Sequence, residues 1–170
     1  LASCNFNFLH PKGNFYLLGR KSDGTFSAPV PIFDNTGLSN GMFYDQRQDR
    51  IFFSNTIGGV YSFVPGEQSY RPEYLKLHFM EACDDLCTDI SGNLWMSDPG
   101  HGTVKVFNPG TSRLMRFAVT GIGQVSSCRI RNDNGHETVY LTELKEANQT
   151  SQRAFDGKRV VIVPARDLLG

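Results

Sequence analysis

Hydrophobic and polar residues alternate along most of this chain in short runs, which is the pattern of half-buried β-strands. The clearest pair of runs is residues 86–88 and residues 94–97, which are separated by the turn-forming residues Ser91-Gly92-Asn93. A short turn of this kind between two apolar-rich runs predicts a β-hairpin. Helical periodicity is absent except for one turn at Ala165–Leu169. The pattern therefore predicts an all-β protein.

The hairpin pattern repeats at a spacing close to 44 residues. The segment that begins at Asn40 has the same layout as the segment that begins at Asp84, 44 residues later. Residues 60–66 return as residues 104–110 at the same spacing, and weaker copies of the strands lie at residues 15–18 and 139–142. A repeat of this length with about four strands is typical of a β-propeller.

The repeats divide the chain into two full blades with an incomplete blade on each side. Residues 1–33 are predicted to end a blade, residues 40–80 and 84–119 to form complete blades, and residues 127–163 to begin a last blade without its fourth strand. Within the first of these stretches, strands are expected at residues 5–10, 14–19 and 26–33. Each blade of a propeller buries its faces against two neighbours. We therefore expect residues 1–170 to be part of one larger propeller domain that another segment or a second chain completes.

Composition adds to this picture by excluding partners. The 170 residues carry no net charge, and 39% of them are hydrophobic, which is an ordinary globular composition. Balanced charge without a basic run argues against a nucleic-acid partner. No apolar stretch approaches the roughly 18 residues of a membrane-spanning helix. We therefore expect no nucleic acid and no membrane as a partner. The small-molecule substrate that we also expect rests on the central channel of a propeller rather than on composition.

The cysteines and one sequon favour a secreted protein. Asn148-Gln149-Thr150 is a glycosylation sequon, so Asn148 is the expected glycosylation site. The four cysteines allow three complete disulfide pairings, among which sequence does not choose. A bridge between Cys83 and Cys128 would join neighbouring repeats, and free buried thiols are the alternative.

Polar residues at the start of the innermost strands are the candidates for chemistry. In a propeller these strands line a central channel, and groups at their starts converge at its mouth. Asn40 and Asp84 hold equivalent starts in consecutive repeats. Their amide and carboxylate oxygens suit Ca²⁺ or Mg²⁺. The simpler interpretation is that both residues only form turns.

Several of these motifs resemble the family of six-bladed β-propellers that includes senescence-marker protein, gluconolactonase and luciferin-regenerating enzyme. The resemblance rests on Ser39-Asn40-Gly41, on Asp84, on Gly92-Asn93-Leu94-Trp95, and on Ser126-Ser127-Cys128 in the last blade. It implies that this chain supplies about three blades, the C-terminal half of the ring. It also implies that a strand from the N-terminal end completes the last blade.

The resemblance also implies one divalent cation, usually Ca²⁺, held by a Glu, an Asn and an Asp. The Asn corresponds to Asn40 and the Asp to Asp84, while the Glu has no counterpart here. The family's substrate-binding Arg and Asn have no counterpart either. The family usually has Pro-Asp-Gly where this chain has Cys83-Asp84-Asp85. Asp85 would then lie beside the cation ligands and alter their geometry.

The loops between the second and third strands of each blade are expected to open at the same end as Asn40 and Asp84. Two of these loops begin at Asn55 and Asp98, and His101 lies in the second. We predict Asn55, Asp98 and His101 as substrate-binding residues, with His101 as a proton donor or hydrogen-bond partner. A solvated loop histidine is the simpler interpretation. A third loop, residues 143–157, carries the sequon and is either a lid or a surface loop.

Three functions remain open. The leading one is a calcium-dependent hydrolase of lactones or esters, with Asp84 as the catalytic residue that activates water or attacks directly. The second is a secondary-metabolism enzyme that works without hydrolysis, by a hetero-Diels–Alder-type cyclisation or a strictosidine-synthase-like condensation. The third is a non-catalytic binding propeller, since fold does not fix function.

Overall fold

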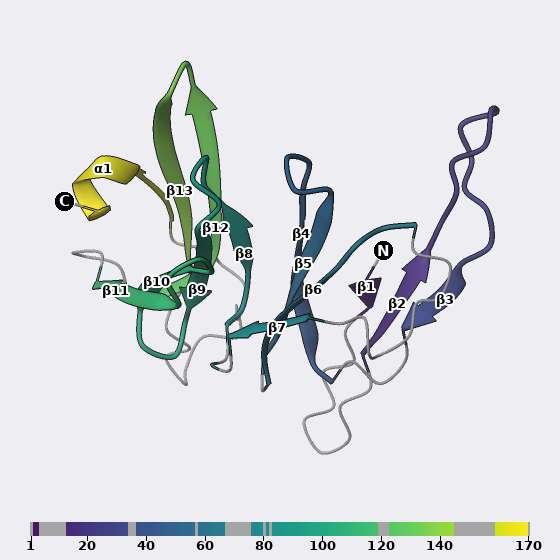
Figure 1. Ribbon diagram of the computed structural model, residues 1–170, viewed down its shortest axis with the longest axis horizontal. Helices are drawn as coiled ribbons and strands as arrows, with labels where there is room; N and C mark the ends of the chain where they lie inside the picture. Colours follow the sequence, from purple (N-terminus) through teal and green to yellow (C-terminus); the bar gives the residue numbers. More distant parts are fainter. Residues whose placement is uncertain are drawn as a thin grey trace. The chain divides into compact units, whose positions relative to one another are not determined.

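The computed structural model describes residues 2–3, 13–33, 37–56, 58–66, 76–79, 81, 83–118, 123–144 and 159–169 (Figure 1). These residues form antiparallel sheets and one short helix. The chain divides into two compact units, Leu1–Ala82 and Cys83–Gly170, and each is described by itself.

The first unit contains two antiparallel sheets. One has the strand order β1-β2-β3, and the other is a four-stranded meander in the order β4-β5-β6-β7. Their bounds are β1 (Ala2–Ser3), β2 (Asn14–Leu17), β3 (Val30–Phe33), β4 (Ser39–Asp45), β5 (Arg50–Asn55), β6 (Gly59–Phe63) and β7 (Lys76–Phe79). The meander occupies the stretch predicted as a blade, residues 40–80, and begins one residue earlier.

The outer strand expected at residues 26–33 is shorter than predicted. β3 begins at Val30, and Phe26 makes only an isolated bridge with Arg20. Pro29 and Pro31 interrupt this stretch, and proline has no N–H to donate to a sheet. The strand expected at residues 5–10 lies outside the described residues.

Phenylalanine side chains join the two sheets of the first unit. Phe15 of β2 and Phe33 of β3 form one buried cluster with Phe53 of β5 and Phe63 of β6. The ring centroids of Phe15 and Phe53 are 4.5 Å apart, and the other pairs meet in edge or tilted contacts, the geometry that aromatic pairs prefer. Burying each ring stabilises the unit by about 2 kcal/mol.

The second unit contains a four-stranded and a three-stranded antiparallel sheet among its described residues. The strand orders are β11-β10-β9-β8 and β12-β13-β14. The elements are β8 (Leu86–Thr88), β9 (Leu94–Asp98), β10 (Thr103–Asn108), β11 (Arg113–Ala118), β12 (Gln124–Asp133), β13 (His136–Leu144), β14 (Arg159–Pro164) and α1 (Ala165–Leu169). The four-stranded sheet and the short helix occur where they were predicted, and β12 begins three residues before the predicted partial blade.

The predicted hairpin forms between β8 and β9, and buried Asp89 fixes its turn. Asp89 accepts hydrogen bonds from the backbone N–H of Asn93 at 2.8 Å and from its side-chain amide at 2.7 Å. It also accepts the indole N–H of Trp95 at 2.9 Å. Asp89 is 2% exposed and Trp95 is fully buried. The carboxylate is tolerated inside the blade because donors surround it, and it satisfies the indole in return.

A hydrogen bond from a backbone N–H to a serine hydroxyl occurs at the same position of the sequence repeat in two blades. In the first unit the Gly41 N–H donates to Ser54 Oγ at 2.8 Å. In the second unit the Asp85 N–H donates to Ser97 Oγ at 2.9 Å. Gly41 and Asp85 are 44 residues apart. The residues before them therefore hold the same position in their two blades, and these residues are Asn40 and Asp84.

Successive four-stranded antiparallel meanders are the blades of a β-propeller, so the all-β prediction is confirmed. No helix in the part of the chain that the structure describes is long and apolar enough to cross a membrane.

Candidate functional site

Hydrogen bonds to β9 fix the start of β8. The Asp84 N–H donates to the Ser97 carbonyl at 3.0 Å, and the Ser97 N–H donates to the Asp85 carbonyl at 2.9 Å. Asp84 is half-buried. The sheet therefore sets the backbone of Asp84 at the end of the blade where β8 begins and β9 ends.

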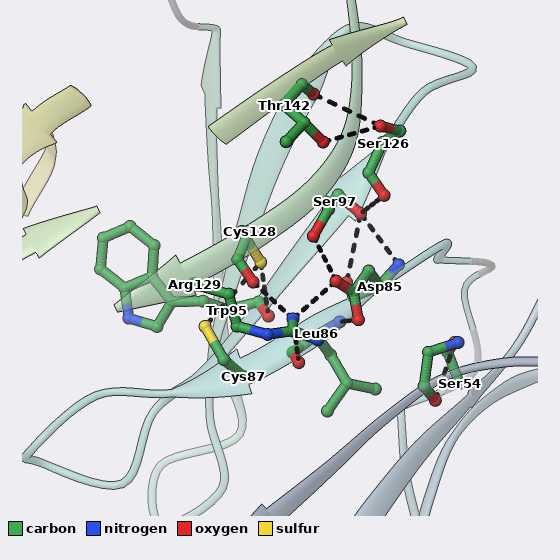
Figure 2. A network of polar contacts seen from close by, with 12 residues as sticks. Ser54, Asp85, Leu86, Cys87, Trp95, Ser97, Ser126, Cys128, Arg129 and Thr142 are labelled. Atoms are coloured by element: carbon green, nitrogen blue, oxygen red, sulfur yellow. Dashed lines mark hydrogen bonds and ion pairs between the residues drawn. The ribbon is translucent and has the colours of Figure 1, made fainter. Parts of the chain in front are cut away.

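Asp85 stands where the family that the sequence resembles usually has glycine. Its side chain binds the neighbouring strand β12 (Figure 2). Its Oδ2 accepts hydrogen bonds from Ser127 Oγ and from Arg129 Nη1, the latter at 2.6 Å. Its Oδ1 accepts the Leu86 N–H at 2.9 Å. The Asp85 side chain is 14% exposed and that of Arg129 is 48% exposed. The Asp85 carboxylate therefore links two blades, and protein donors bind both of its oxygens.

Hydroxyl groups continue from this link toward β13 (Figure 2). Ser97 Oγ lies 3.2 Å from the Asp85 carbonyl and 3.0 Å from the Ser126 carbonyl, so its proton can reach either acceptor. Ser126 Oγ and Thr142 Oγ1 are 2.9 Å apart. These side chains tie the two blades of the second unit together at the end where Asp84 lies.

Asp98, at the end of β9, is the centre of a second polar group. Its Oδ2 lies 2.8 Å from both Lys105 Nζ and His101 Nδ1. The side chains of Asp98 and Lys105 are 9% and 4% exposed, whereas that of His101 is 78% exposed. Burial would raise the pKa of Asp98, but the hydrogen bonds from Lys105 and His101 outweigh it and hold that pKa below its usual value. Asp98 is therefore a carboxylate at neutral pH, and His101 Nδ1 donates to it.

Asn40 and Asn55 lie at one end of their blade in the first unit. Asn40 Nδ2 donates to Thr56 Oγ1 at 3.3 Å. Asn55 Oδ1 accepts the Leu38 N–H at 3.2 Å, and its amide packs against Gly37. Gly37 has a φ of +71°, and a Cβ there would collide with the Asn55 amide. Asn55 thus holds the segment before β4, and its role in substrate binding stays a prediction.

The structure brings two of the predicted substrate-binding residues, Asp98 and His101, into direct contact. Sequence reasoning missed Lys105, which completes this group. A signal for it exists, because Lys105 lies between Val104 and Val106 in a strand with a buried interior, where a lysine requires a partner.

The Asp85–Arg129 pair carries no comparable signal. The two residues are 44 positions apart, and they meet only because β8 and β12 lie side by side.

Cys83, Cys87 and Cys128 are buried, and none of them is in a disulfide bond in this structure. The structure therefore has no Cys83–Cys128 bridge and holds these three cysteines in the reduced form. The glycosylation candidate Asn148 and the loop around it lie outside the described residues, as does Cys4.

Asn40 and Asp84 suit a hard cation by the chemistry of their side chains, since one offers an amide oxygen and the other a carboxylate. They belong to different units. In the part of the chain that the structure describes, no group of three or more His, Cys, Asp and Glu side chains could hold a metal ion. The cation site at Asn40 and Asp84 therefore stays a prediction.

The successive antiparallel meanders, with polar side chains at their ends, define the class of protein as a β-propeller. No family model matches the sequence, and no curated protein matches it. Solved structures do match, and this chain spans about half of the length of the three that follow.

Regucalcin from Agrobacterium tumefaciens, described as a calcium-binding protein, matches with a TM-score of 0.59 and 14% identity over 80% of this chain and 46% of its own. A luciferin-regenerating enzyme matches with a TM-score of 0.62 and 17% identity over 90% of this chain and 52% of its own. A gluconolactonase from Xanthomonas campestris matches with a TM-score of 0.56 and 21% identity over 79% of this chain and 42% of its own. These are the kinds of propeller that the sequence motifs resemble, so that resemblance is confirmed at the level of the fold.

Proposed function

We propose that this chain supplies half of a calcium-dependent propeller enzyme that hydrolyses a lactone or ester of a small organic molecule. The observation that carries the proposal is the equivalence of Asn40 and Asp84, two hard-oxygen side chains that precede the same hydrogen-bonded position in successive blades. The likeness in fold to a gluconolactonase and to the calcium-binding regucalcin supports it.

In this proposal Asn40 and Asp84 each contribute one ligand to the cation. The Asn40 amide nitrogen donates to Thr56, which fixes the end of the amide that carries the oxygen ligand. A bound divalent cation would supply Lewis acidity to the substrate carbonyl. Asp84 would also activate water or attack the carbonyl carbon directly.

The Asp98–His101 pair would transfer the proton between the protein and the substrate or a water molecule. Because Asp98 is ionised and accepts the His101 Nδ1–H, the opposite nitrogen, Nε2, is the one that exchanges a proton with the substrate or a water molecule. Lys105 balances the charge of Asp98 inside the blade. His101 is exposed enough to meet a small molecule.

A complementary half of the propeller would complete the site and the last blade. β14 forms an outer strand of its three-stranded sheet. Val160 and Ile162 on this strand are each 60% exposed, which is unusual for large apolar side chains on a sheet edge. A further strand from the complementary half would cover them. We also propose that the protein is secreted and glycosylated at Asn148.

Asp85 beside Asp84 is the sequence feature that favours a non-hydrolytic enzyme, because it would alter the geometry of the cation ligands. The Asp85 carboxylate is bound by Ser127, Arg129 and the Leu86 N–H. These groups hold the Asp85 side chain against β12, so this feature no longer separates the two kinds of enzyme. We therefore propose hydrolysis in preference to a non-hydrolytic reaction.

Calcium titration calorimetry of the whole protein, with its complementary half, tests the proposal. Asp84→Asn should weaken calcium binding by more than the roughly 10- to 100-fold that loss of an outer partner costs at metal sites. Asn40→Ala should weaken it less, because a neutral ligand is lost. The matched control is Asp133→Asn at an exposed carboxylate, which should leave the affinity unchanged. Equal calcium affinity in the wild type and Asp84→Asn would contradict the proposal.

A further inference from the structure

Two buried thiols meet between the blades of the second unit. Cys87 lies in β8 and Cys128 in β12, and their sulfur atoms are 3.9 Å apart (Figure 2). Cys87 is 1% exposed and Cys128 is 0% exposed. The residues are 41 positions apart in sequence, so the packing of one blade against the next brings them together.

The backbones on both sides of the thiols are held in place. Arg129 Nη1 donates to the Leu86 carbonyl at 3.2 Å and to the Cys128 carbonyl at 2.7 Å. The Cys128 S–H donates to the Trp95 carbonyl at 3.3 Å, and Trp95 pairs with Cys87 across the β8–β9 hairpin. With the strands fixed, rotation of the two side chains is the movement that would close the sulfur gap to the roughly 2.05 Å of a disulfide.

We propose that Cys87 and Cys128 form a disulfide that links neighbouring blades when the protein folds in the presence of a disulfide oxidant such as oxidised glutathione. One cysteine thiolate attacks the oxidant, which forms a mixed disulfide and releases one glutathione thiol. The second cysteine then attacks the mixed disulfide and releases the other glutathione thiol. The two cysteines lose two protons and two electrons, and the oxidant takes up both.

Burial places the attack on the oxidant before the blades close, and the second attack at the moment when blade packing brings the two sulfur atoms together. The hydrogen bond with Cys87 and the burial of the site raise the pKa of the Cys128 thiol, so the reactive thiolate is scarce in the folded protein. Glutathione also cannot reach sulfur atoms that are this deeply buried. The same burial protects the disulfide from reductants once it has formed. Because Asp84 lies three residues before Cys87, the link would also stiffen the start of β8, next to Asp84.

Peptide mapping of the wild-type protein tests the proposal without any variant. The protein is produced in an oxidising secretory compartment, alkylated before extraction, and digested with trypsin and Asp-N. Asp-N cuts before Asp84 and Asp85, which separates Cys83 from Cys87. We expect residues 85–88 to be joined to residues 117–129, and the pair to separate on reduction. Cys83 should be recovered in its alkylated form.

Recovery of Cys87 and Cys128 as alkylated thiols would overturn the proposal, as would a link from Cys128 to any other cysteine. Two variants serve as a matched pair, since Cys83 is buried in the same unit. Cys83→Ser should keep the linked peptides, and Cys87→Ser should lose them. If Cys87→Ser fails to fold, the wild-type map still decides the question. The inference is independent of the proposed enzymatic function.

Discussion

The ion pair between Asp85 and Arg129 links the residue before β8 to β12, directly beside Asp84. Its O–N distance is 2.6 Å, and the carboxylate is largely buried although the guanidinium is half-exposed. Water screens the exposed partner, so the pair contributes modestly to stability. The hydrogen bonds from Arg129 to two carbonyl groups add to it.

A double-mutant cycle measures this contribution. Asp85→Asn, Arg129→Gln and the double variant should give a coupling energy of about 1 kcal/mol in urea unfolding. The exposed pair Arg131–Asp133, with side chains 65% and 56% exposed, is the control and should give roughly 0 to 0.5 kcal/mol. Equal coupling in both pairs would show that Asp85 does not hold the blades together.

Lys105 and Asp98 form a more deeply buried pair. Lys105→Met should lower the free energy of unfolding by about 3 kcal/mol at pH 7, because it leaves the Asp98 carboxylate buried with only His101 as a charged partner. Chemical denaturation of both proteins at pH 7 gives this difference. A loss close to zero at pH 7 would mean that the pair adds nothing to the fold.

The Lys105–Asp98 pair also predicts that the stability of the fold depends on pH. The folded-state pKa of Asp98 lies below its ordinary value of 3.8. Its ionisation therefore stabilises the fold above that value, and the stabilisation is lost as the pH falls through the folded-state pKa. The stability difference between the wild type and Lys105→Met should accordingly shrink below about pH 4. A difference that stays constant from pH 7 to pH 3 would contradict this account.

At the scale of the element, the β8–β9 hairpin depends on one carboxylate. Asp89→Ala should destabilise the protein by about 3 kcal/mol, because the buried Trp95 N–H and the Asn93 amide lose their acceptor. Asp133→Ala, at an exposed aspartate 44 residues further along, should change stability by no more than about 0.5 kcal/mol. Thermal or urea unfolding of the two variants compares them, and equal losses would refute the role of Asp89.

The elements that sequence predicts well are those whose signals are local. The β8–β9 hairpin follows from its turn residues and the apolar runs beside them, and these lie within a few positions of one another. β3 was predicted too long because alternation continues through Pro29 and Pro31, where the backbone cannot donate to a sheet.

The candidate site divides in the same way. Asn40, Asp84 and the Asp98–His101 loop follow from the repeat and from short spacings along the chain. The link from Asp85 to β12 and the contact between Cys87 and Cys128 join residues more than 40 positions apart. Such contacts depend on how blades pack, and a single sequence carries no pattern that identifies them.

At the scale of the whole molecule, the proposed enzyme needs a complementary half of the propeller. Co-expression of this chain with that half should give a stable complex of one copy each, measured by light scattering after size exclusion. Val160→Lys with Ile162→Lys should weaken the complex, because the exposed apolar side chains of β14 would be covered in it. Ile90→Lys, at an exposed apolar side chain of a complete blade, is the control and should leave the complex unchanged. A well-folded 19.0 kDa monomer that does not bind the other half would contradict this prediction.

Turnover of a panel of lactones and esters by the whole protein tests the central claim most directly. It is measured with and without a calcium chelator, for the wild type, Asp84→Asn and Asp133→Asn. The account predicts that chelation abolishes wild-type turnover and that added calcium restores it. It also predicts that Asp84→Asn is inactive with an unchanged Tm, while Asp133→Asn behaves as the wild type. Full turnover in chelator by both the wild type and Asp84→Asn would contradict a calcium-dependent hydrolase and would favour an enzyme that works by positioning its substrate.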